Sequence, residues 1–335
     1  MTAPGQTMPE IAGNRFLITG GASLIGSHVT DALLAAGAAE VRLLDNFALG
    51  TPEVIAHLGD DQRVTLIRGD VLRLNEVIDA TRDVAGVYAL AAFLSLPLSR
   101  NVPLGIAVNT QGVVNTLEAA RIAGVRRVIL SSSVSTYGNS TPDIITEETP
   151  FTSAGQQPVT NLYGTSKLMG EALCAHYGRA HGLEWNALRF SSVYGERQHA
   201  RAINANFIAD SYDAIQRGER PVILGDGGEV HDYIHVADIA EACVMAMTSR
   251  SQGHVMTIAT GEDTTLNQVA SLLLAACGAR HLTPEHRQDT RAVKSASSEH
   301  LGFSRARAEA TIGWIPRVTL AEGIRRYVAW RQAGG

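Results

Sequence analysis

The sequence predicts an α/β fold, with a doubly wound parallel sheet followed by a smaller, discontinuous C-terminal domain. Three observations indicate this fold class. Short apolar segments alternate with helical segments over the first 190 residues, which is typical of parallel strands joined by helices. A glycine-rich turn directly follows the first apolar segment. Small or polar residues end the later apolar segments, at the sheet edge where such folds bind ligands.

The first expected strand, residues 15–19, ends at the turn Gly20-Gly-Ala-Ser-Leu-Ile-Gly26, and a helical pattern follows to about residue 36. Such glycines let the backbone approach the pyrophosphate of a dinucleotide, which lies on the helix N-terminus. The second expected strand, residues 40–44, ends at Asp45 and Asn46, where a carboxylate can accept hydrogen bonds from both ribose hydroxyls. Because no arginine follows Asp45, NAD is favoured over NADP. The turn lacks the lysine of a nucleoside-triphosphate loop, which excludes ATP and GTP.

Further strands and helices continue the alternation. Strands are expected at residues 64–68, 86–91, 127–131 and 184–189, and helices at residues 75–81 and 104–123 and around Tyr163. After Arg189 the pattern changes to helices at residues 236–247, 266–276 and 321–330, with a strand at residues 254–260. We therefore expect a Rossmann-type NAD-binding domain at residues 1–190, to which residues 233–260 return. Residues 191–232 and 261–335 are expected to form the substrate-binding domain.

Tyr163 and Lys167 stand four residues apart in a segment with helix-compatible residues, so both lie on one face of a helix. An ammonium beside a phenol stabilises the phenolate and lowers the tyrosine pKa from about 10. A phenol tuned in this way can remove a proton from a substrate hydroxyl. The spacing alone is common on solvated helix faces, so its weight comes from the motifs that accompany it.

Composition excludes several classes of protein. The net charge of -5 and the pI of about 6.1 predict no basic face for nucleic acid or an anionic membrane. The three cysteines are far apart in the sequence, which suits a reducing compartment. The eleven histidines show no metal-ligand spacing, so no metal is expected. With no signal-peptide pattern and no apolar run long enough to span a bilayer, we expect a cytoplasmic protein.

Several short motifs occur together in a fixed order along nearly the whole chain, from about residue 14 to residue 331. They are Thr19-Gly-Gly-Ala-Ser-Leu-Ile-Gly26, Ser131-Ser-Ser133 with Tyr137-Gly138, Tyr163-x-x-x-Lys167, Leu188-Arg189 with Val193-Tyr-Gly195, and Asp232-Tyr-Ile-His-Val236. In this combination the chain resembles the extended short-chain dehydrogenase/reductase family, in particular its NAD-dependent nucleotide-sugar epimerase/dehydratase branch, which includes enzymes of the UDP-glucose 4-epimerase type.

The resemblance implies a role for each matched position. The cofactor residues would be Gly20, Ser23, Leu24, Ile25, Gly26, Asp45, Asn46, Asp70, Val71, Leu90, Ala91, Ala92, Asn109, Ser131, Tyr163 and Lys167. The catalytic residues would be Ser133, Tyr163 and Lys167. Tyr163 would take the proton of a sugar hydroxyl while hydride passes to NAD⁺, Ser133 would hydrogen-bond the same oxygen, and Lys167 would bind the nicotinamide ribose. In an epimerase the 4-keto sugar then turns over and receives the hydride on its other face, so NAD stays bound.

Two positions after the expected catalytic serine limit the reaction. Dehydratases resembling this chain carry Asp-Glu there, because a β-elimination needs an additional acid/base pair. This chain has Val134 and Ser135, neither of which exchanges a proton near neutral pH. Elimination is therefore not expected, and epimerisation or plain dehydrogenation remains.

Other departures concern the binding of the ligands. Ser23 replaces the middle glycine of the turn. Ser192 stands where the family usually has an asparagine at the substrate diphosphate, and His231 where it has an arginine; a histidine offers one donor and is largely neutral at pH 7. Either Arg197, Arg201 or Arg291 supplies the missing charge, or the substrate is not an ordinary nucleoside-diphosphate sugar. The candidate substrate-binding residues are Ser133, Ser192, Arg201, His231 and Arg291.

Three functions remain open from the sequence. The first is an NAD-dependent epimerase of a nucleoside-diphosphate sugar. The second is an NAD-dependent dehydrogenase or reductase of a non-nucleotide sugar or polyol, and the third is a catalytically idle NAD-binding regulator. The resemblance also implies a homodimer, formed through the helix at residues 104–123 and the helix that carries Tyr163.

Overall fold

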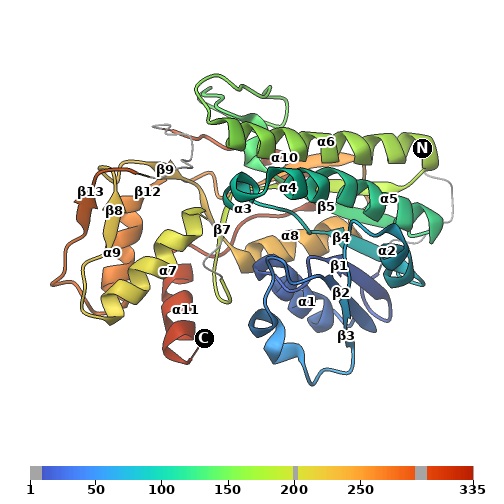
Figure 1. The fold of residues 1–335 in the computed structure, drawn as a ribbon, viewed down its shortest axis with the longest axis horizontal. Coiled ribbons are helices and arrows are strands. Elements are labelled where there is room, and N and C mark those ends of the chain that lie inside the picture. Colours follow the sequence, from blue (N-terminus) through green and yellow to red (C-terminus); the bar gives the residue numbers. More distant parts are fainter. Residues whose placement is uncertain (1–9, 199–202, 291–299, 335) are drawn as a thin grey trace.

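A parallel sheet of seven strands is the centre of the computed structural model, which describes residues 10–198, 203–290 and 300–334 (Figure 1). The strands lie in the order β11-β6-β5-β4-β1-β2-β3, and every neighbouring pair is parallel. Their bounds are β1 Arg15–Thr19, β2 Glu40–Asp45, β3 Val64–Arg68, β4 Gly86–Ala89, β5 Arg127–Ser133, β6 Glu184–Phe190 and β11 His254–Ile258. The predicted doubly wound parallel sheet is confirmed.

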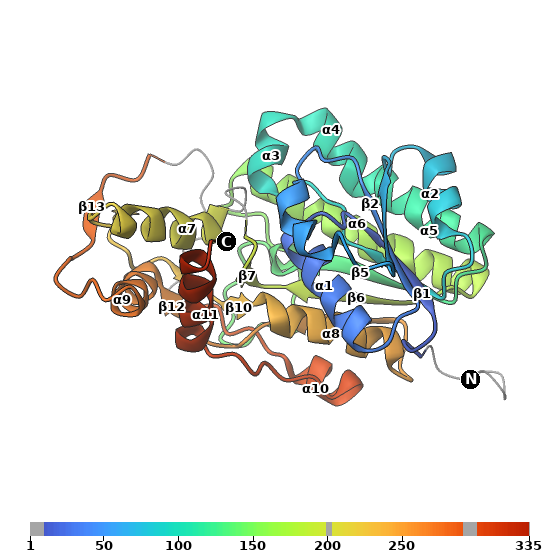
Figure 2. The same ribbon diagram turned by 90° about the horizontal axis from the view of Figure 1, so that it is seen from below.

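Helices cover both faces of this sheet (Figures 1 and 2). On one face lie α1 Leu24–Ala35 and α8 Val236–Thr248, which pack against each other. On the other face lie α2 Leu74–Thr81, α5 Val113–Ile122 and α6 Pro158–His181. Shorter elements are the 3₁₀ helices η1 Pro52–Leu58 and η3 Val134–Tyr137, and the helices α3 Ser95–Arg100 and α4 Val102–Ala107. No helix in the described ranges has both the length and the apolarity that a bilayer crossing requires.

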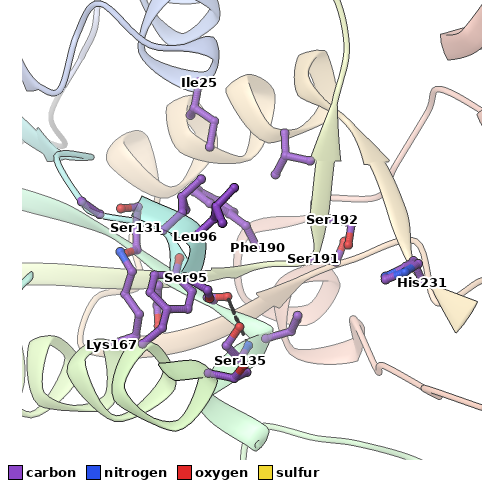
Figure 3. Close-up of a pocket in the computed structure, with 18 of the residues that line it drawn as sticks. Ile25, Ser95, Leu96, Ser131, Ser135, Lys167, Phe190, Ser191, Ser192 and His231 are labelled. Carbon is purple, nitrogen blue, oxygen red and sulfur yellow. Dashed lines mark hydrogen bonds between the residues drawn. The ribbon is translucent and has the colours of Figure 1, made fainter. Parts of the chain in front are cut away.

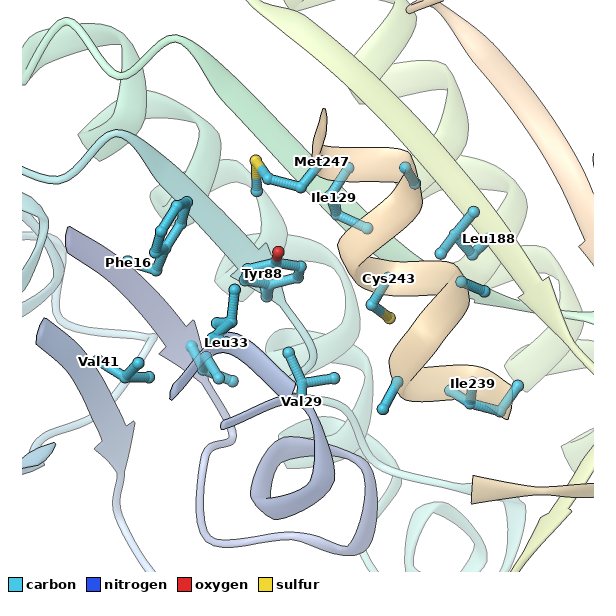
Figure 4. Close-up of a cluster of buried hydrophobic side chains, with 14 of the residues drawn as sticks. Phe16, Val29, Leu33, Val41, Tyr88, Ile129, Leu188, Ile239, Cys243 and Met247 are labelled. Carbon is cyan, nitrogen blue, oxygen red and sulfur yellow. The ribbon is translucent and has the colours of Figure 1, made fainter. Parts of the chain in front are cut away.

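The middle residues of the central strands are apolar because consecutive side chains enter two different cores. In β1, Phe16 and Ile18 belong to the core beneath α1 and α8, whereas Leu17 belongs to the core beneath α2, α5 and α6. Figure 4 shows Tyr88 of β4 lying between α1 and α8, beside Cys243. Both faces of the sheet are thereby shielded, and its ligand-binding groups lie at the strand ends.

The second part of the structure lies beside the carboxyl edge of the sheet. It contains α7 Ile203–Gln216, α9 Leu266–Ala276 and α11 Leu320–Gln332. Three two-stranded pairs complete it: β7 Ser192–Tyr194 with β10 Tyr233–His235, β8 Val222–Leu224 with β13 Glu285–Arg287, and β9 Val230–His231 with β12 Thr264–Thr265. Its core is rich in tyrosine, with Tyr194, Tyr212 and Tyr327 all buried.

The helix expected over residues 104–123 is divided in the structure. A π-helical segment, η2 Val108–Gly112, separates α4 from α5. Within it, the buried Asn109 amide accepts a hydrogen bond from Phe93 N (2.7 Å) and donates one to Phe93 O (3.0 Å). π-segments inside helices are frequent at functional sites, and this one holds the chain that follows β4.

The helix α10 Ala306–Ile312 and the segment after it return to the sheet. Trp314 is fully buried against α8, and its indole Nε1 donates a hydrogen bond to Asp238 O (3.0 Å). The Asp238 carboxylate in turn accepts hydrogen bonds from Arg317 N and Val318 N. This contact joins the C-terminal segment to the first core.

We expect Trp314→Ala to lower the free energy of unfolding by about 3–5 kcal/mol, because it removes a large buried ring from the core. Denaturant unfolding followed by circular dichroism measures this change. The neighbouring Ile315 is 46% exposed, so Ile315→Ala is a matched control that should shift stability by about 0.5 kcal/mol or less. Equal effects of the two substitutions would contradict this description of the core.

Candidate active site

Two adjoining cavities open at the carboxyl edge of the sheet. The larger has a volume of about 420 Å³, and the smaller has a volume of about 90 Å³. They share lining residues from the glycine-rich turn, the chain after β2 and the chain after β4. The cleft therefore runs continuously along the strand ends, where doubly wound sheets bind nucleotides.

The glycine-rich turn brings the backbone close to the chain that follows β4. Gly20 has φ +71°, and a Cβ at this position would lie 2.8 Å from Ala91 Cα. A Cβ on Gly26 would lie 2.6 Å from Gly21 O, so α1 could not pack so closely on the turn. Ser23, which replaces a glycine, donates a hydrogen bond from Oγ to Gly20 O (2.7 Å) and accepts one from Gly26 N (3.1 Å). Its side chain thus caps the N-terminus of α1 and also binds the backbone of the turn at Gly20.

Asp45 lines the smaller cavity at the end of β2. Its carboxylate accepts hydrogen bonds from Ala22 N (3.0 Å) and Phe47 N (2.8 Å), which orient it in the cleft. Burial raises the pKa of Asp45, and these two hydrogen bonds oppose that effect. The exposed Asn46 lines the same cavity. A glycine turn beside an oriented ribose acid is the donor and acceptor set that a dinucleotide needs, so the residues present fit NAD.

The structure places most of the other predicted cofactor residues along the cleft. Those that line one or both cavities are Gly20, Ser23, Leu24, Ile25, Asp45, Asn46, Val71, Leu90, Ala91, Ala92, Ser131, Tyr163 and Lys167. Gly26, Asp70 and Asn109 line neither cavity. Asp70 accepts a hydrogen bond from Leu72 N (2.9 Å), and Asn109 binds the Phe93 backbone. Each of these side chains binds the backbone of a neighbouring loop, and their contact with the cofactor stays a prediction.

Ser133, at the end of β5, and Tyr163 and Lys167, on α6, all line the larger cavity. All three are less than 10% exposed. Figure 3 shows Lys167 pointing from α6 towards Ser131. Lys167 Nζ donates a hydrogen bond to Ser131 O (2.8 Å) and lies 5.7 Å from the centre of the Tyr163 ring. Ser133 Oγ donates a hydrogen bond to Ser135 Oγ (3.1 Å). The helical spacing of tyrosine and lysine does bring both groups to one site.

Burial is the largest influence on the pKa values of Tyr163 and Lys167. Burial raises the pKa of Tyr163 to about 12, and the hydrogen bond with Ser133 opposes this. Burial also lowers the pKa of Lys167 to about 8, and the charge of Glu171 opposes this. The Tyr163 pKa, which was expected to be lowered by Lys167, is therefore raised in the protein without cofactor. A cationic group beside the phenol would counteract burial.

The far end of the larger cavity carries Ser192 and His231 (Figure 3). His231 Nε2 lies 2.8 Å from Glu229 Oε1, and the imidazole packs against Tyr233. Arg201 and Arg291, the other predicted substrate residues, lie outside the described residues. Arg197 binds the Asp31 carboxylate (2.7 Å) on α1. Among the described lining residues there is no arginine, and Lys167 is the one lysine.

Sequence motifs did not reveal the apolar wall of this cavity. It is formed by side chains from segments that are distant in the sequence, among them Leu49, Leu96, Phe190, Leu301 and Phe303. Phe190 ends β6, next to Arg189 of a recognised motif, and was the one member with a local signal. Leu49 lies in the chain after β2 and Leu96 in α3, whereas Leu301 and Phe303 come from the chain after β13.

Comparison with known proteins supports this interpretation of the cleft. Residues 16–259 match the model of the NAD dependent epimerase/dehydratase family. A UDP-glucose 4-epimerase of Mycolicibacterium smegmatis is 30% identical over 325 residues, which cover 94% of this chain and 97% of that protein. A dTDP-glucose 4,6-dehydratase of Actinoplanes sp. is 27% identical, over 95% of this chain and 98% of that protein.

Solved structures agree with the sequence relatives. The UDP-glucose 4-epimerase of Thermus thermophilus, solved as a complex with NAD, superposes with a TM-score of 0.81. It is 31% identical, with 95% of this chain and 99% of that chain covered. The sequence-based recognition and the prediction of NAD are thus confirmed. A glycine turn, a ribose acid and a Ser-Tyr-Lys site in one cleft, together with these matches, show that the chain belongs to the NAD-dependent epimerase/dehydratase family.

Proposed function

We propose that this protein is an NAD-dependent epimerase of a nucleoside-diphosphate sugar, acting by transient oxidation at C4. The observation that carries the proposal is the convergence of Ser133, Tyr163 and Lys167 on a cavity continuous with the cleft of Gly20 and Asp45. When bound there, NAD would accept and return a hydride. The protein would bind the sugar, orient it and move its hydroxyl proton.

Each member of the site has a separate task in this proposal. Tyr163 takes the proton of the sugar hydroxyl as the general base and returns it to the same oxygen after the sugar has turned. Ser133 hydrogen-bonds that oxygen. Lys167, held by Ser131 O, contributes an ammonium that favours the phenolate. Asp45 accepts hydrogen bonds from the adenosine ribose of the cofactor.

The lining of the larger cavity favours epimerisation over elimination. Val134 and Ser135 occupy the two positions after Ser133. Asp232 is the one carboxylate among the described residues that line this cavity. Its oxygens already accept hydrogen bonds from Ser191 Oγ, Thr260 N and Gly261 N. A β-elimination needs a free acid/base pair near the substrate, which these residues do not provide.

One observation favours the second candidate, an NAD-dependent dehydrogenase or reductase of a non-nucleotide sugar or polyol. His231, at the far end of the cavity, is paired with the Glu229 carboxylate. A carboxylate beside this histidine offsets positive charge where a diphosphate would need it. The idle-regulator alternative has less support, because the Ser133, Tyr163 and Lys167 side chains all reach the cavity.

The domain division and the location are parts of this proposal. Residues 1–190 with 233–260 would bind NAD, and residues 191–232 with 261–335 would bind the sugar. The segment of α10 and Trp314 is an exception within the second range, because it packs in the first core. All three cysteines are free thiols, and we place the protein in the cytoplasm on that basis.

We also propose that the protein forms a homodimer through the outer faces of α4, α5 and α6. These helices carry the exposed apolar side chains Leu104, Ile122, Leu162 and Met169. Exposed apolar surface of this kind can be buried when two proteins associate.

The first expected outcome concerns the reaction. Incubation of the purified protein with UDP-, dTDP- and GDP-sugars, without added cofactor, should convert one of them to an isomer of unchanged mass with no accumulation of NADH. Chromatography and absorbance at the NADH band measure this. Tyr163→Phe should lower the rate by about 10²–10⁴-fold, because it removes the general base.

Tyr177→Phe is the matched control for this experiment. It removes a phenol from the same helix, where Tyr177 OH donates to Glu118 (3.1 Å) away from the cavity, and it should keep the parent rate. Stoichiometric NADH formation with a polyol would instead establish the dehydrogenase. If both Tyr163→Phe and Tyr177→Phe keep the parent rate, Tyr163 is not the base.

The second expected outcome concerns the cofactor. Gly20→Ala should weaken retention of NAD by about tenfold or more, because the new methyl group strains a left-handed residue and meets Ala91. NAD released on denaturation, measured per chain, reports this. Gly37→Ala at the other end of α1 is the control, since Gly37 also has a positive φ (+87°) but lies away from both cavities. It should lower stability and leave the NAD content unchanged.

The third expected outcome concerns assembly. Light scattering should give twice the 35.6 kDa mass of one chain. Met169→Glu should produce monomers, because it places a charge in an apolar contact. Ile144→Glu, an equally drastic change on the loop before α6, should leave the dimer intact. A parent protein with the mass of one chain would exclude the homodimer.

A further inference from the structure

A buried ion pair lies directly behind the Ser-Tyr-Lys site. Glu171 of α6 accepts two hydrogen bonds from Arg189 of β6, from Nε (2.9 Å) and from Nη2 (2.7 Å). Both side chains are less than 10% exposed. The same carboxylate accepts a hydrogen bond from Ser132 Oγ (2.5 Å) of β5. One acid therefore joins three elements at the edge of the sheet that carries the active site.

Ser132 stands between two residues of the site, Ser131 and Ser133. Ser131, before it, accepts the hydrogen bond from Lys167 Nζ. Ser133, after it, points into the cavity. Because three consecutive strand residues move together, the contact between Glu171 and Ser132 sets the positions of both neighbours. A buried bidentate arginine pair is a rigid anchor for such a contact.

Charge gives Glu171 a second effect. It stands four residues after Lys167 in α6, one turn along the same helix face. Two buried cations are near it: Arg189, which it binds directly, and Lys167, whose charge it influences through space. Burial lowers the pKa of Lys167, and the charge of Glu171 counteracts this. Without Glu171, two buried positive charges would remain uncompensated.

The other titratable groups near this pair do not replace it. Glu147 presents its backbone O to Arg189 Nη1 (3.4 Å), while its carboxylate accepts from Thr257 N. The Tyr137 ring lies under the Arg189 guanidinium (4.8 Å), and burial raises its pKa. Burial also raises the pKa of Cys174 to about 12, and that of Tyr163 likewise. These three groups are neutral near pH 7. The Glu147 carboxylate lies 3.6 Å from Arg307 Nε, so Glu171 is the carboxylate that binds Arg189 directly.

We propose that Glu171 is a positioning residue for the reaction, which holds the end of β5 through Ser132 and keeps the Lys167 side chain as an ammonium. The inference rests on the proposed function, since it assigns Glu171 a task in that reaction. It does not place Glu171 in contact with the sugar or the cofactor.

The composition of the chain allows a direct test by NMR. Lys167 and Lys294 are the two lysines of the whole sequence, so a sample labelled with ¹³C at lysine Cε gives two signals. Lys294→Arg identifies the signal of Lys167. Its titration midpoint in the protein without added cofactor should lie near pH 8. In Glu171→Gln the midpoint should fall by about one pH unit or more, because an opposite charge one turn away is removed.

A matched ion pair at the opposite end of the same strands is the control. Arg127 of β5 binds Glu184 of β6 through Nη2 (2.7 Å) and is likewise buried. Glu184→Gln should lower thermal stability as Glu171→Gln does, but should leave the Lys167 midpoint unchanged.

In the NAD-loaded enzyme, Glu171→Gln should lower kcat by about 10- to 100-fold with KM within about threefold. The basic limb of its kcat profile should move to lower pH, whereas Glu184→Gln should keep the parent profile.

A double replacement covers the case in which Glu171→Gln does not fold. Glu171→Met with Arg189→Met removes both charges and leaves no unpaired ion, which folded proteins tolerate. It should still lower kcat by at least about tenfold, because Ser132 loses its acceptor. The matching Arg127→Met with Glu184→Met should keep kcat within about twofold. Glu171→Asp keeps the charge and should keep the Lys167 midpoint near that of the parent protein.

The outcomes separate the two claims. If the Lys167 midpoint and kcat respond equally to the Glu171 and Glu184 variants, Glu171 has a structural role alone and the inference is overturned. If no nucleotide sugar is epimerised but the midpoint shifts in Glu171→Gln only, the proposed function fails while the charge effect of Glu171 stands. A shift in midpoint together with the loss in kcat supports both.

Discussion

The hydrogen bonds at the end of β5 are the contacts on which the site depends. Three consecutive serines end the strand, and the first two bind neighbouring elements. Ser131 Oγ donates to Ala89 O of β4 (3.1 Å), and Ser131 O accepts from Lys167 of α6. Ser132 donates to Glu171, which leaves Ser133 to face the cavity. Short side chains with one hydroxyl allow this, because larger residues would separate the sheet from α6.

The cleft divides its tasks between backbone and side chains. At the cofactor end, the close approach of Gly20 to Ala91 and the capping of α1 by Ser23 shape the chain itself. At the reaction centre, buried polar side chains supply the chemistry, and burial moves the pKa values of Tyr163 and Lys167 in opposite directions. Desolvation disfavours the charged form of each group, so the charges placed around them decide whether they can act.

Three residues show where sequence reasoning was insufficient. Ser23 was recognised as a replacement of the middle glycine, but its capping of α1 is not visible from a motif comparison. Asn109 was singled out as a cofactor residue, but the sequence did not reveal that its amide binds the Phe93 backbone from a π-helical segment. The Tyr163 pKa was expected to fall beside Lys167, but full burial raises it. In each case the outcome depends on neighbours from other parts of the chain.

Residue types and their spacing were enough to predict the alternation of strands and helices and the glycine turn. They also predicted the acid at the end of β2 and the placing of Tyr163 and Lys167 on one helix face. These are local patterns, which follow from period, turn chemistry and residue type. Packing between distant segments was needed to form the apolar wall of Leu49, Leu96 and Phe303 and to pair His231 with Glu229. It was also needed to bury Trp314 in the first core and to bring Glu171 to both Ser132 and Arg189. Burial and charge compensation are sums over neighbours distant in the sequence, and only the folded chain brings those neighbours together.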